Sequence, residues 1–328
     1  TITIAIRSNT TSLQYEVTDS GKRFLGIPVP LSSGANTAAT RRDTTDTLPI
    51  TTYSARLGNP CHTNLTYMAK HDTITDFYTD PALVNEHLEQ AHGIGTHEAH
   101  IIGALKTKGY VKSTREGRRD KGDETFGSRL LTDTWIFEKD VRGLNGEIGM
   151  QVFVDEFTSS TWVTSIKSMR DIPKIIQRQI IEIEEMARSI HGDGFYIQNV
   201  QCGADAKNNI QLQQRNVVRS IKADRHPNHN SETLRTILDQ SLTLLQLTPV
   251  QGHAANGIVE RAIQELRKIT KSIMHQVGFS SSLKELTPLA AASAAQSLDF
   301  WPHTSNPGNM SRRQARTGQK GSIDDLRP

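Results

Sequence analysis

The order of β-rich and helical patterns between residues 131 and 276 constrains the fold of this chain more than any other feature. Three β-rich runs come first, separated only by short turn-forming stretches: 131–140, 146–157 and 160–168. This spacing is typical of consecutive antiparallel strands. Helical and β-rich patterns then alternate at 171–190, 216–224, 231–240, 242–250 and 256–276. The order predicts an α/β fold in which helices pack on the faces of a mixed sheet.

The first of these helices has the clearest pattern. Apolar residues recur at helical spacing, at positions 172, 175, 176, 180, 183, 187 and 190. We expect Asp171 to cap this helix and Pro173 to lie in its first turn, where proline is tolerated. One face is therefore expected to pack on the sheet.

Charge and cysteine content exclude several classes of protein. The 328 residues carry a net charge of only +3, which excludes a uniformly basic surface but permits local basic patches. The two cysteines, Cys61 and Cys202, are too far apart to indicate a disulfide scaffold and favour a reducing compartment. No stretch approaches the apolar length that a membrane span requires, so we expect no membrane partner.

The rest of the chain is divided by composition. Residues 1–84 are rich in small polar residues without a sustained period, which indicates an irregular segment of loops and weak strands. Helical spacing interrupted by glycine predicts two short helices early in 85–125, followed by a charged linker. The sheet pattern defines a core at 130–300, and 301–328 forms a trailing segment. The stretch 192–216 has no clear pattern.

Three acidic residues stand at positions where chemistry is often found. Asp155 and Asp224 end two predicted strands, and Glu260 opens the last helix of the core. The 35 residues between Asp224 and Glu260 allow one helix and one strand, enough to return the chain to the same sheet edge. Carboxylates that meet there would repel one another, and Mg²⁺ or Mn²⁺ would remove the repulsion. Paired divalent ions can then support phosphoryl transfer.

Two alternatives to this trio remain. Glu260 at a helix N-terminus is also stabilised by the helix dipole, without any catalytic role. Asp205 is a competing second acid, although we prefer Asp224 because of its position at a strand end and its spacing to Glu260.

The spacing of the acids and the phrase TPVQGHAANGIVERAI (248–263) resemble the catalytic core of retroviral-type integrases, the DDE family. The resemblance is greatest to copia-type long-terminal-repeat retrotransposons. Further segments agree in order along the chain: the His-rich stretch 85–109, the strand region 132–163 and the trailing stretch 311–328. Together they extend the resemblance over roughly 85–328, and the co-linear set is more specific than any single piece.

The resemblance implies a ribonuclease-H-like core with a small N-terminal helical segment. It implies that Asp155, Asp224 and Glu260 hold Mg²⁺, or Mn²⁺, in a polynucleotidyl transferase that inserts element DNA into target DNA. The partners would be the element ends, the target DNA and further copies of the chain. The protein would act in the nucleus after a cytoplasmic stage in a virus-like particle, as part of a retrotransposon polyprotein.

Basic residues follow Glu260 on the last core helix, namely Arg261, Arg267, Lys268 and Lys271. Helical spacing places Arg267 and Lys271 on the face of Glu260, where they are candidates for contacts with DNA phosphates. The alternative is an ordinary solvated helix face.

The His-rich segment departs from the family pattern. His87 and His92 match the histidine pair of a zinc module, with four residues between them, but the expected Cys-x-x-Cys is missing. Four zinc ligands therefore cannot be assembled in the usual way. We expect a helix pair held by apolar contacts through residues such as Leu88, without bound zinc.

Two other functions share this fold and these residues. A catalytically inactive relic or domesticated DNA-binding module would retain the fold, and the unusual His-Pro turn after Asp224 favours that alternative. A ribonuclease-H-type nuclease would use the same carboxylates with water as the nucleophile. Motifs of serine hydrolases, phosphate-binding loops and zinc proteases are missing from the sequence.

Overall fold

The computed structural model describes most of the chain from residue 49 onward. The described residues are 49–75, 77–78, 80–92, 125–139, 141–192, 197–201, 210–214, 217–248, 257–276 and 281–326. The predictions for residues 1–48 and 93–124, and the alternative acid Asp205, fall outside these ranges.

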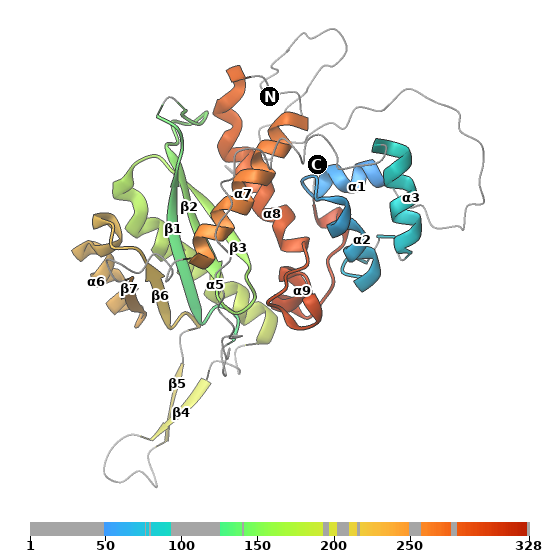
Figure 1. Cartoon of the computed structure of the whole chain (residues 1–328). Coiled ribbons are helices and arrows are strands. Elements are labelled where there is room, and N and C mark those ends of the chain that lie inside the picture. Colours follow the sequence, from blue (N-terminus) through green and yellow to red (C-terminus); the bar gives the residue numbers. More distant parts are fainter. Residues whose placement is uncertain are drawn as a thin grey trace, which may run out of the picture.

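A five-stranded mixed sheet forms the centre of the molecule (Figure 1). Its strands are β1 (Arg129–Ile136), β2 (Gly149–Asp155), β3 (Thr161–Ile166), β6 (Ser220–Ala223) and β7 (Leu244–Leu247). The order is β3-β2-β1-β6-β7, with β1, β2 and β3 antiparallel and with β6 parallel to both β1 and β7. The predicted α/β fold, a mixed sheet flanked by helices with three antiparallel strands at its start, is confirmed.

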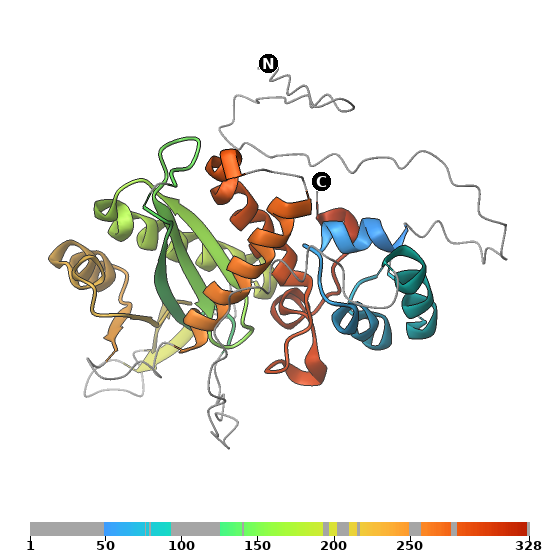
Figure 2. The same ribbon diagram turned by 45° about the horizontal axis from the view of Figure 1, so that its top comes forward.

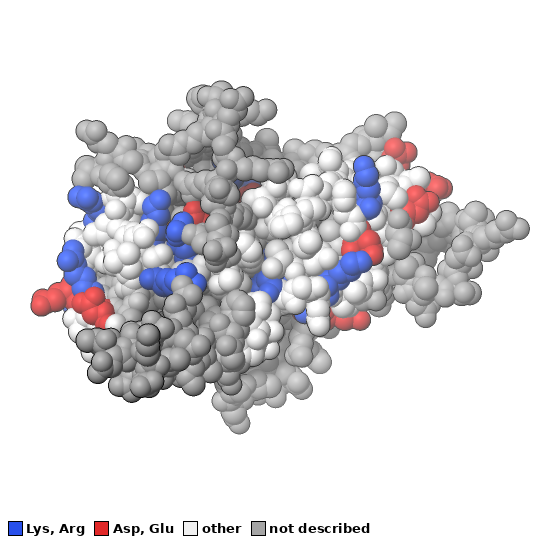
Figure 3. All heavy atoms as spheres, turned by 90° about the horizontal axis from the view of Figure 1, so that it is seen from below, with Lys and Arg blue, Asp and Glu red and all other residues white. Residues whose placement is uncertain are grey.

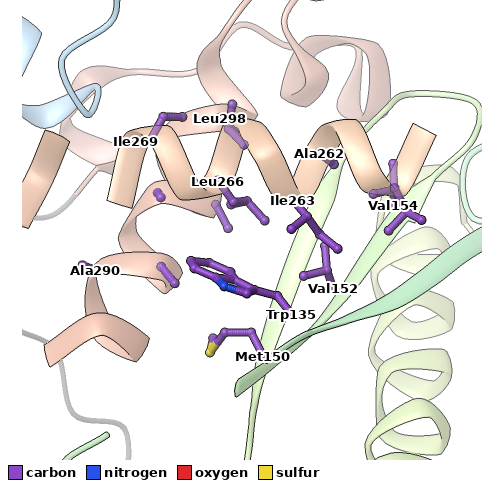
Figure 4. Close-up of a cluster of buried hydrophobic side chains, with 14 of the residues drawn as sticks. Trp135, Met150, Val152, Val154, Ala262, Ile263, Leu266, Ile269, Ala290 and Leu298 are labelled. Atoms are coloured by element: carbon purple, nitrogen blue, oxygen red, sulfur yellow. The ribbon is translucent and has the colours of Figure 1, made fainter. Parts of the chain in front are cut away.

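Two helices cover one face of the sheet, α7 (Gly257–Gln276) and α8 (Thr287–Phe300). Figure 4 shows Trp135, Val152 and Val154 of the strands packed against Ile263 and Leu266 of α7. These positions alternate along β1 and β2, as expected for side chains that point to one face of a strand. The predicted helix at 256–276 is therefore held against the strands by its apolar stripe.

The opposite face is covered by α5 (Ile172–His191) and α6 (Glu232–Gln240), which pack on Leu130, Phe153 and Ile221. The apolar face of α5 is buried at the predicted spacing, and Pro173 lies in its first turn. Asp171 is the N-cap residue of α5, as predicted, but its side chain makes no hydrogen bond to this helix and instead accepts one from the Ser168 N–H in a preceding capping box.

The stretch without a clear sequence pattern contains a two-stranded antiparallel ribbon of β4 (Ile197–Gln201) and β5 (Ile210–Gln214). It extends away from the main sheet in Figure 1. Two separate strands of five residues explain why no helical period appears there.

A separate helical unit precedes the sheet: α1 (Ile50–Arg56), α2 (His62–His71) and α3 (Pro81–His92). The expectation of loops and weak strands up to residue 84 is therefore wrong for 50–71, and α3 crosses the predicted boundary at 84. The unit has its own apolar core, which includes Tyr53, Leu65 and Leu88. Figure 2 shows the three helices beside α8, on the side of the molecule away from α6.

The trailing segment completes this unit. Phe300, Ile323 and Leu326 belong to the same apolar core as α1–α3, and Trp301 donates its indole N–H to the Leu57 carbonyl. The short helix α9 (Arg312–Thr317) lies between this unit and the sheet. Residues 301–326 are therefore part of the folded body.

Two arginines of the trailing segment hold it against the core. Arg312 is 3 % exposed, pairs with Glu265 of α7 at 2.9 Å and donates to the Ser159 carbonyl. Arg316 pairs with Asp299 of α8 at 2.6 Å. Buried charges persist when they are paired and hydrogen-bonded, so these contacts fix the segment in one position.

Candidate active site

Asp224 directly follows Ala223, the last residue of β6, so the strand ends one residue before the predicted end at Asp224. Its Oδ1 accepts a hydrogen bond from the His226 backbone N–H at 3.2 Å and a short one from the Nδ1 of His229. Burial raises the pKa of Asp224, but the hydrogen bonds from the His229 ring and the His226 N–H, with the positive charge of these rings when protonated, lower it by more, so the pKa lies below its ordinary value. Asp224 is therefore held as a carboxylate.

Glu260 lies in the first turn of α7, as predicted, and is partly buried. The next residues toward the sheet, Val259 and Ile263, are buried in the core that α7 shares with β1 and β2. This packing fixes the start of α7 beside β1.

The third acid of the candidate site is Asp133, in the middle of β1. Burial is the main cause that raises its pKa above the ordinary value. The negative charges of Asp224 and Glu260 raise this pKa as well, whereas the hydrogen bond from the Thr134 N–H lowers it. The parallel register of β1 and β6 pairs Thr132 with Ala223, so Asp133 and Asp224 are the residues that follow this pair. Glu260 lies at the start of α7, which packs on β1. The three acids therefore form an electrostatically coupled trio.

Asp155 does not belong to this group, and its assignment to the site is corrected. Its side chain is fully buried and accepts three hydrogen bonds: from the Gly127 N–H at 3.0 Å, the Thr158 N–H at 2.7 Å and the Thr158 hydroxyl at 2.6 Å. Both carboxylate oxygens are thus engaged: Oδ1 by Gly127, which precedes β1, and Oδ2 by Thr158 in the turn that connects β2 and β3.

Strand register explains the difference between Asp155 and Asp133. Asp155 pairs with Leu130 and therefore shares its face of the sheet, whereas Asp133 pairs with Val152 on the opposite face. Leu130, which is paired with Asp155, and Asp133 are three residues apart on β1, a distance of about 10 Å along a strand. Asp133 could have been found in the sequence from the alternation Leu131, Asp133, Trp135, which puts an acid on a buried strand face.

The chemistry of the trio suits a hard divalent cation, since carboxylate oxygens are the ligands that Mg²⁺ and Mn²⁺ prefer. Among the residues that the structure describes, no three His, Cys, Asp or Glu side chains are grouped closely enough to hold a metal ion as they stand. The donor set therefore fits a divalent ion in kind, and coordination by all three acids requires side-chain adjustment.

The predicted basic residues extend along α7 from this site. Arg261, Arg267 and Lys271 are exposed, and Lys268 is partly exposed. The Arg267 guanidinium lies 5.5 Å from the ring centroid of Trp135, the next residue after Asp133 on the same strand face. Positive charge thus borders the acidic trio along one side of α7.

Elsewhere on the surface the two signs of charge are mixed. Figure 3 shows Lys and Arg (blue) and Asp and Glu (red) on the same face of the described residues. No helix in the described part of the chain is long and apolar enough to cross a membrane.

The predicted histidine pair lies at the end of α3. The His87 Nδ1 is 3.1 Å from the Tyr78 hydroxyl, and Leu88 is buried as expected. The side chain of His92 and the residues after it lie outside the described part of the chain. The prediction that this segment holds no zinc stays a prediction.

Comparisons with known proteins give matches among solved structures alone. No protein-family model matches the chain, and neither does any curated protein. The catalytic core domain of HTLV-2 integrase, solved in complex with magnesium in a trimeric form, is similar in structure, with a TM-score of 0.37 and 14% identity. The match covers 58% of this chain and 97% of that one.

Proposed function

We propose that this chain contains the integrase core of a copia-type retrotransposon polyprotein, a metal-dependent polynucleotidyl transferase that joins element DNA to target DNA. The observation that carries the proposal is the parallel register of β1 and β6, which places Asp133 beside Asp224 under the start of α7, where Glu260 lies. These acids come from a strand, a strand end and a helix start that lie far apart in the sequence. The sequence resemblance around Glu260 supports the same assignment.

In this proposal Asp133, Asp224 and Glu260 would hold Mg²⁺ or Mn²⁺. The bound ions would supply charge neutralisation and activation of the attacking oxygen. The chain itself keeps Asp224 ionised through its hydrogen bonds, and it keeps Glu260 against β1 by the packing of α7. Asp133 needs a nearby positive charge to ionise readily, since burial and the other two acids raise its pKa.

The DNA backbone would lie along the exposed side of α7. Arg267 and Lys271 follow Glu260 at helical spacing, with Arg261 and Lys268 on a neighbouring face. Lys and Arg bind phosphates without reading sequence, as an enzyme requires that acts on many target sites. Action in the nucleus, a cytoplasmic stage in virus-like particles and self-association on paired DNA ends are further parts of the proposal, by resemblance to the family.

A second function, an inactive DNA-binding module with the same fold, is favoured by one observation. The described acids are not grouped closely enough to hold a metal ion as they stand. Such a module would use the basic residues of α7 without turnover.

Incubation of the full chain with a labelled terminal-repeat DNA end and Mg²⁺ or Mn²⁺ separates these functions. We expect nicking and strand transfer by the wild type and none by Asp224→Asn. Asp239→Asn, which changes an exposed acid on α6, is the matched control and is expected to retain activity. Equal residual signal in the wild type and Asp224→Asn would refute catalysis at this site, and a preference for RNA–DNA hybrids would indicate a nuclease.

A further inference from the structure

A buried polar network connects the sheet to Asp224. It consists of Thr132 and Thr134 on β1, Gln151 on β2 and His229 in the short 3-10 turn η3 (Pro227–Asn230) after β6. Thr132 and Gln151 are fully buried and His229 is 1 % exposed, whereas the Asp224 side chain is 41 % exposed. The network therefore leads from the interior of the protein to the candidate site.

The orientation of the Gln151 amide follows from its neighbours. The Thr132 hydroxyl donates to the Val152 carbonyl at 2.9 Å, so its single proton is engaged. Gln151 Nε2, 2.6 Å from that hydroxyl oxygen, must then be the donor. Gln151 Oε1 accepts from the Thr134 hydroxyl at 2.8 Å, which agrees with the same orientation.

The amide orientation in turn sets the tautomer of His229. Gln151 Nε2 lies 3.1 Å from His229 Nε2, and an amide N–H can only donate, so this ring nitrogen accepts. A neutral imidazole then carries its proton on Nδ1. That Nδ1–H points to Asp224 Oδ1, with which it forms the short hydrogen bond.

This arrangement leaves one oxygen of Asp224 available. Oδ1 accepts from the His229 ring and from the His226 N–H, whereas Oδ2 has no hydrogen bond to any residue that the structure describes. A carboxylate fixed through one oxygen cannot rotate freely, so the position of the other oxygen is fixed as well.

We propose that His229 is a positioning residue that orients Asp224, in a tautomer imposed by Gln151, so that Oδ2 is presented to the divalent cation of the proposed active site. The ion-binding part of this inference rests on the proposed function. Hydrogen-bonded partners of metal ligands orient them, and their loss typically lowers metal affinity by about 10- to 100-fold. Neither ring nitrogen of His229 would itself be a ligand, because one donates to Asp224 and the other accepts from Gln151.

Two conservative substitutions of His229 distinguish a role in orienting Asp224 from a role as a hydrogen-bond partner of Gln151 alone. His229→Asn retains an N–H near the place of Nδ1 and keeps the donor to Asp224. His229→Gln retains a polar atom near the place of Nε2 and keeps the partner of Gln151, but it loses the donor to Asp224. Gln151→Met removes the donor that sets the tautomer and touches neither Asp224 nor the cation.

The test measures Mn²⁺ affinity of the full chain by electron paramagnetic resonance, with thermal melting of every variant. We expect His229→Asn to bind Mn²⁺ within about threefold of the wild type and His229→Gln to bind about tenfold more weakly. Thr243→Val, which removes a buried hydroxyl that donates to the Val218 carbonyl, controls for loss of stability alone. The opposite order, with His229→Gln as tight as the wild type and His229→Asn weaker, would overturn the positioning role.

A second readout is independent of the metal. Nitrogen-15 correlation spectra of the imidazole rings, with the His229 signal identified by its loss in His229→Gln, should show the proton on Nδ1 in the wild type. They should show a mixture of tautomers in Gln151→Met. A proton on Nε2 in the wild type would refute the inference. If Mn²⁺ binding does not depend on Asp133 and Glu260, the proposed function fails, and the spectra still decide the tautomer.

Discussion

Asp133 and Asp155 lie on neighbouring paired strands, yet the protein uses the two acids in opposite ways. Asp155 is fully buried, and its oxygens accept hydrogen bonds from Gly127 and Thr158. Asp133 is partly buried, accepts from the adjacent Thr134 N–H and lies within the influence of two other carboxylates. The strand face on which an acid lies therefore decides whether it closes a turn or faces the site.

This difference has an energetic consequence. A carboxylate that satisfies buried N–H groups stabilises the fold, because removing it leaves those donors without partners. A carboxylate that is brought close to like charges costs stability and is retained for another reason, such as binding a cation. We therefore expect function to depend on Asp133 and stability to depend on Asp155.

The largest expected effect is on catalysis. Asp133→Asn should lower divalent-ion-dependent strand transfer by at least about a hundredfold, because it removes one of three charges that would stabilise the reacting groups. Strand-transfer assays on a terminal-repeat oligonucleotide measure this effect. Activity within a few-fold of the wild type would show that catalysis does not depend on Asp133.

The same substitution has a predicted pH dependence in stability. The raised pKa of Asp133 means that its charged form is disfavoured in the folded state, so Asp133→Asn should melt at the same or a higher temperature at neutral pH. The difference from the wild type should shrink as the pH falls through the raised pKa and disappear below about pH 3, where Asp133 is protonated in both the folded and the unfolded state. Thermal melts across this pH range check the sign.

Asp155→Ala should act on stability instead. It leaves the buried Gly127 and Thr158 donors without their acceptor and is expected to lower the free energy of unfolding by about 3 kcal/mol. Urea unfolding measures the loss. Metal-ion affinity per folded molecule should not change, and a selective loss of that affinity would show that Asp155 serves the site after all.

Binding of DNA should distinguish the two faces of the sheet. Replacing both Arg267 and Lys271, on the Asp133 side, by alanine should weaken binding to a DNA duplex by about tenfold. It should also reduce the slope of log K against the logarithm of the salt concentration by up to about two in magnitude. Lys174→Ala, an exposed lysine of α5 on the Asp155 side, is the control and should leave binding unchanged. If Lys174→Ala weakened DNA binding as much as the double substitution, DNA would not bind preferentially along α7.

The smallest effect is expected at the hydroxyl that supports Asp155. Thr158→Val removes the hydrogen bond at 2.6 Å and keeps the one from the backbone N–H, so a loss of about 1 kcal/mol is expected in urea unfolding. If Thr158→Val lost as much stability as Asp155→Ala, the Thr158 hydroxyl alone, and not the backbone N–H groups, would account for the stabilisation by Asp155.

Much of the core could be predicted from the sequence, because long segments show a clear hydrophobic period and the order of these segments indicates the fold. The helix 172–191 and the three antiparallel strands follow from local patterns that agree with the fold. Asp224 and Glu260 could be placed near one another because the lengths between them allow one helix and one strand. These elements depend little on distant contacts.

The rest depended on information that local patterns do not carry. Strand register, which separates Asp133 from Asp155, appears only when β1 and β2 pair. The helices α1 and α2 are short, with seven and ten residues, and they are stabilised by Phe300, Ile323 and Leu326 from the far end of the chain. Tertiary contacts of this kind override local propensity.

The central claim is that Asp133, and not Asp155, completes the acidic site with Asp224 and Glu260. Mn²⁺ affinity of Asp133→Asn and Asp155→Asn, measured side by side on folded full-length protein, tests it most directly. We predict that Asp133→Asn binds Mn²⁺ at least about tenfold more weakly than the wild type and that Asp155→Asn binds it equally well. Wild-type affinity in Asp133→Asn with a loss in Asp155→Asn would contradict the account.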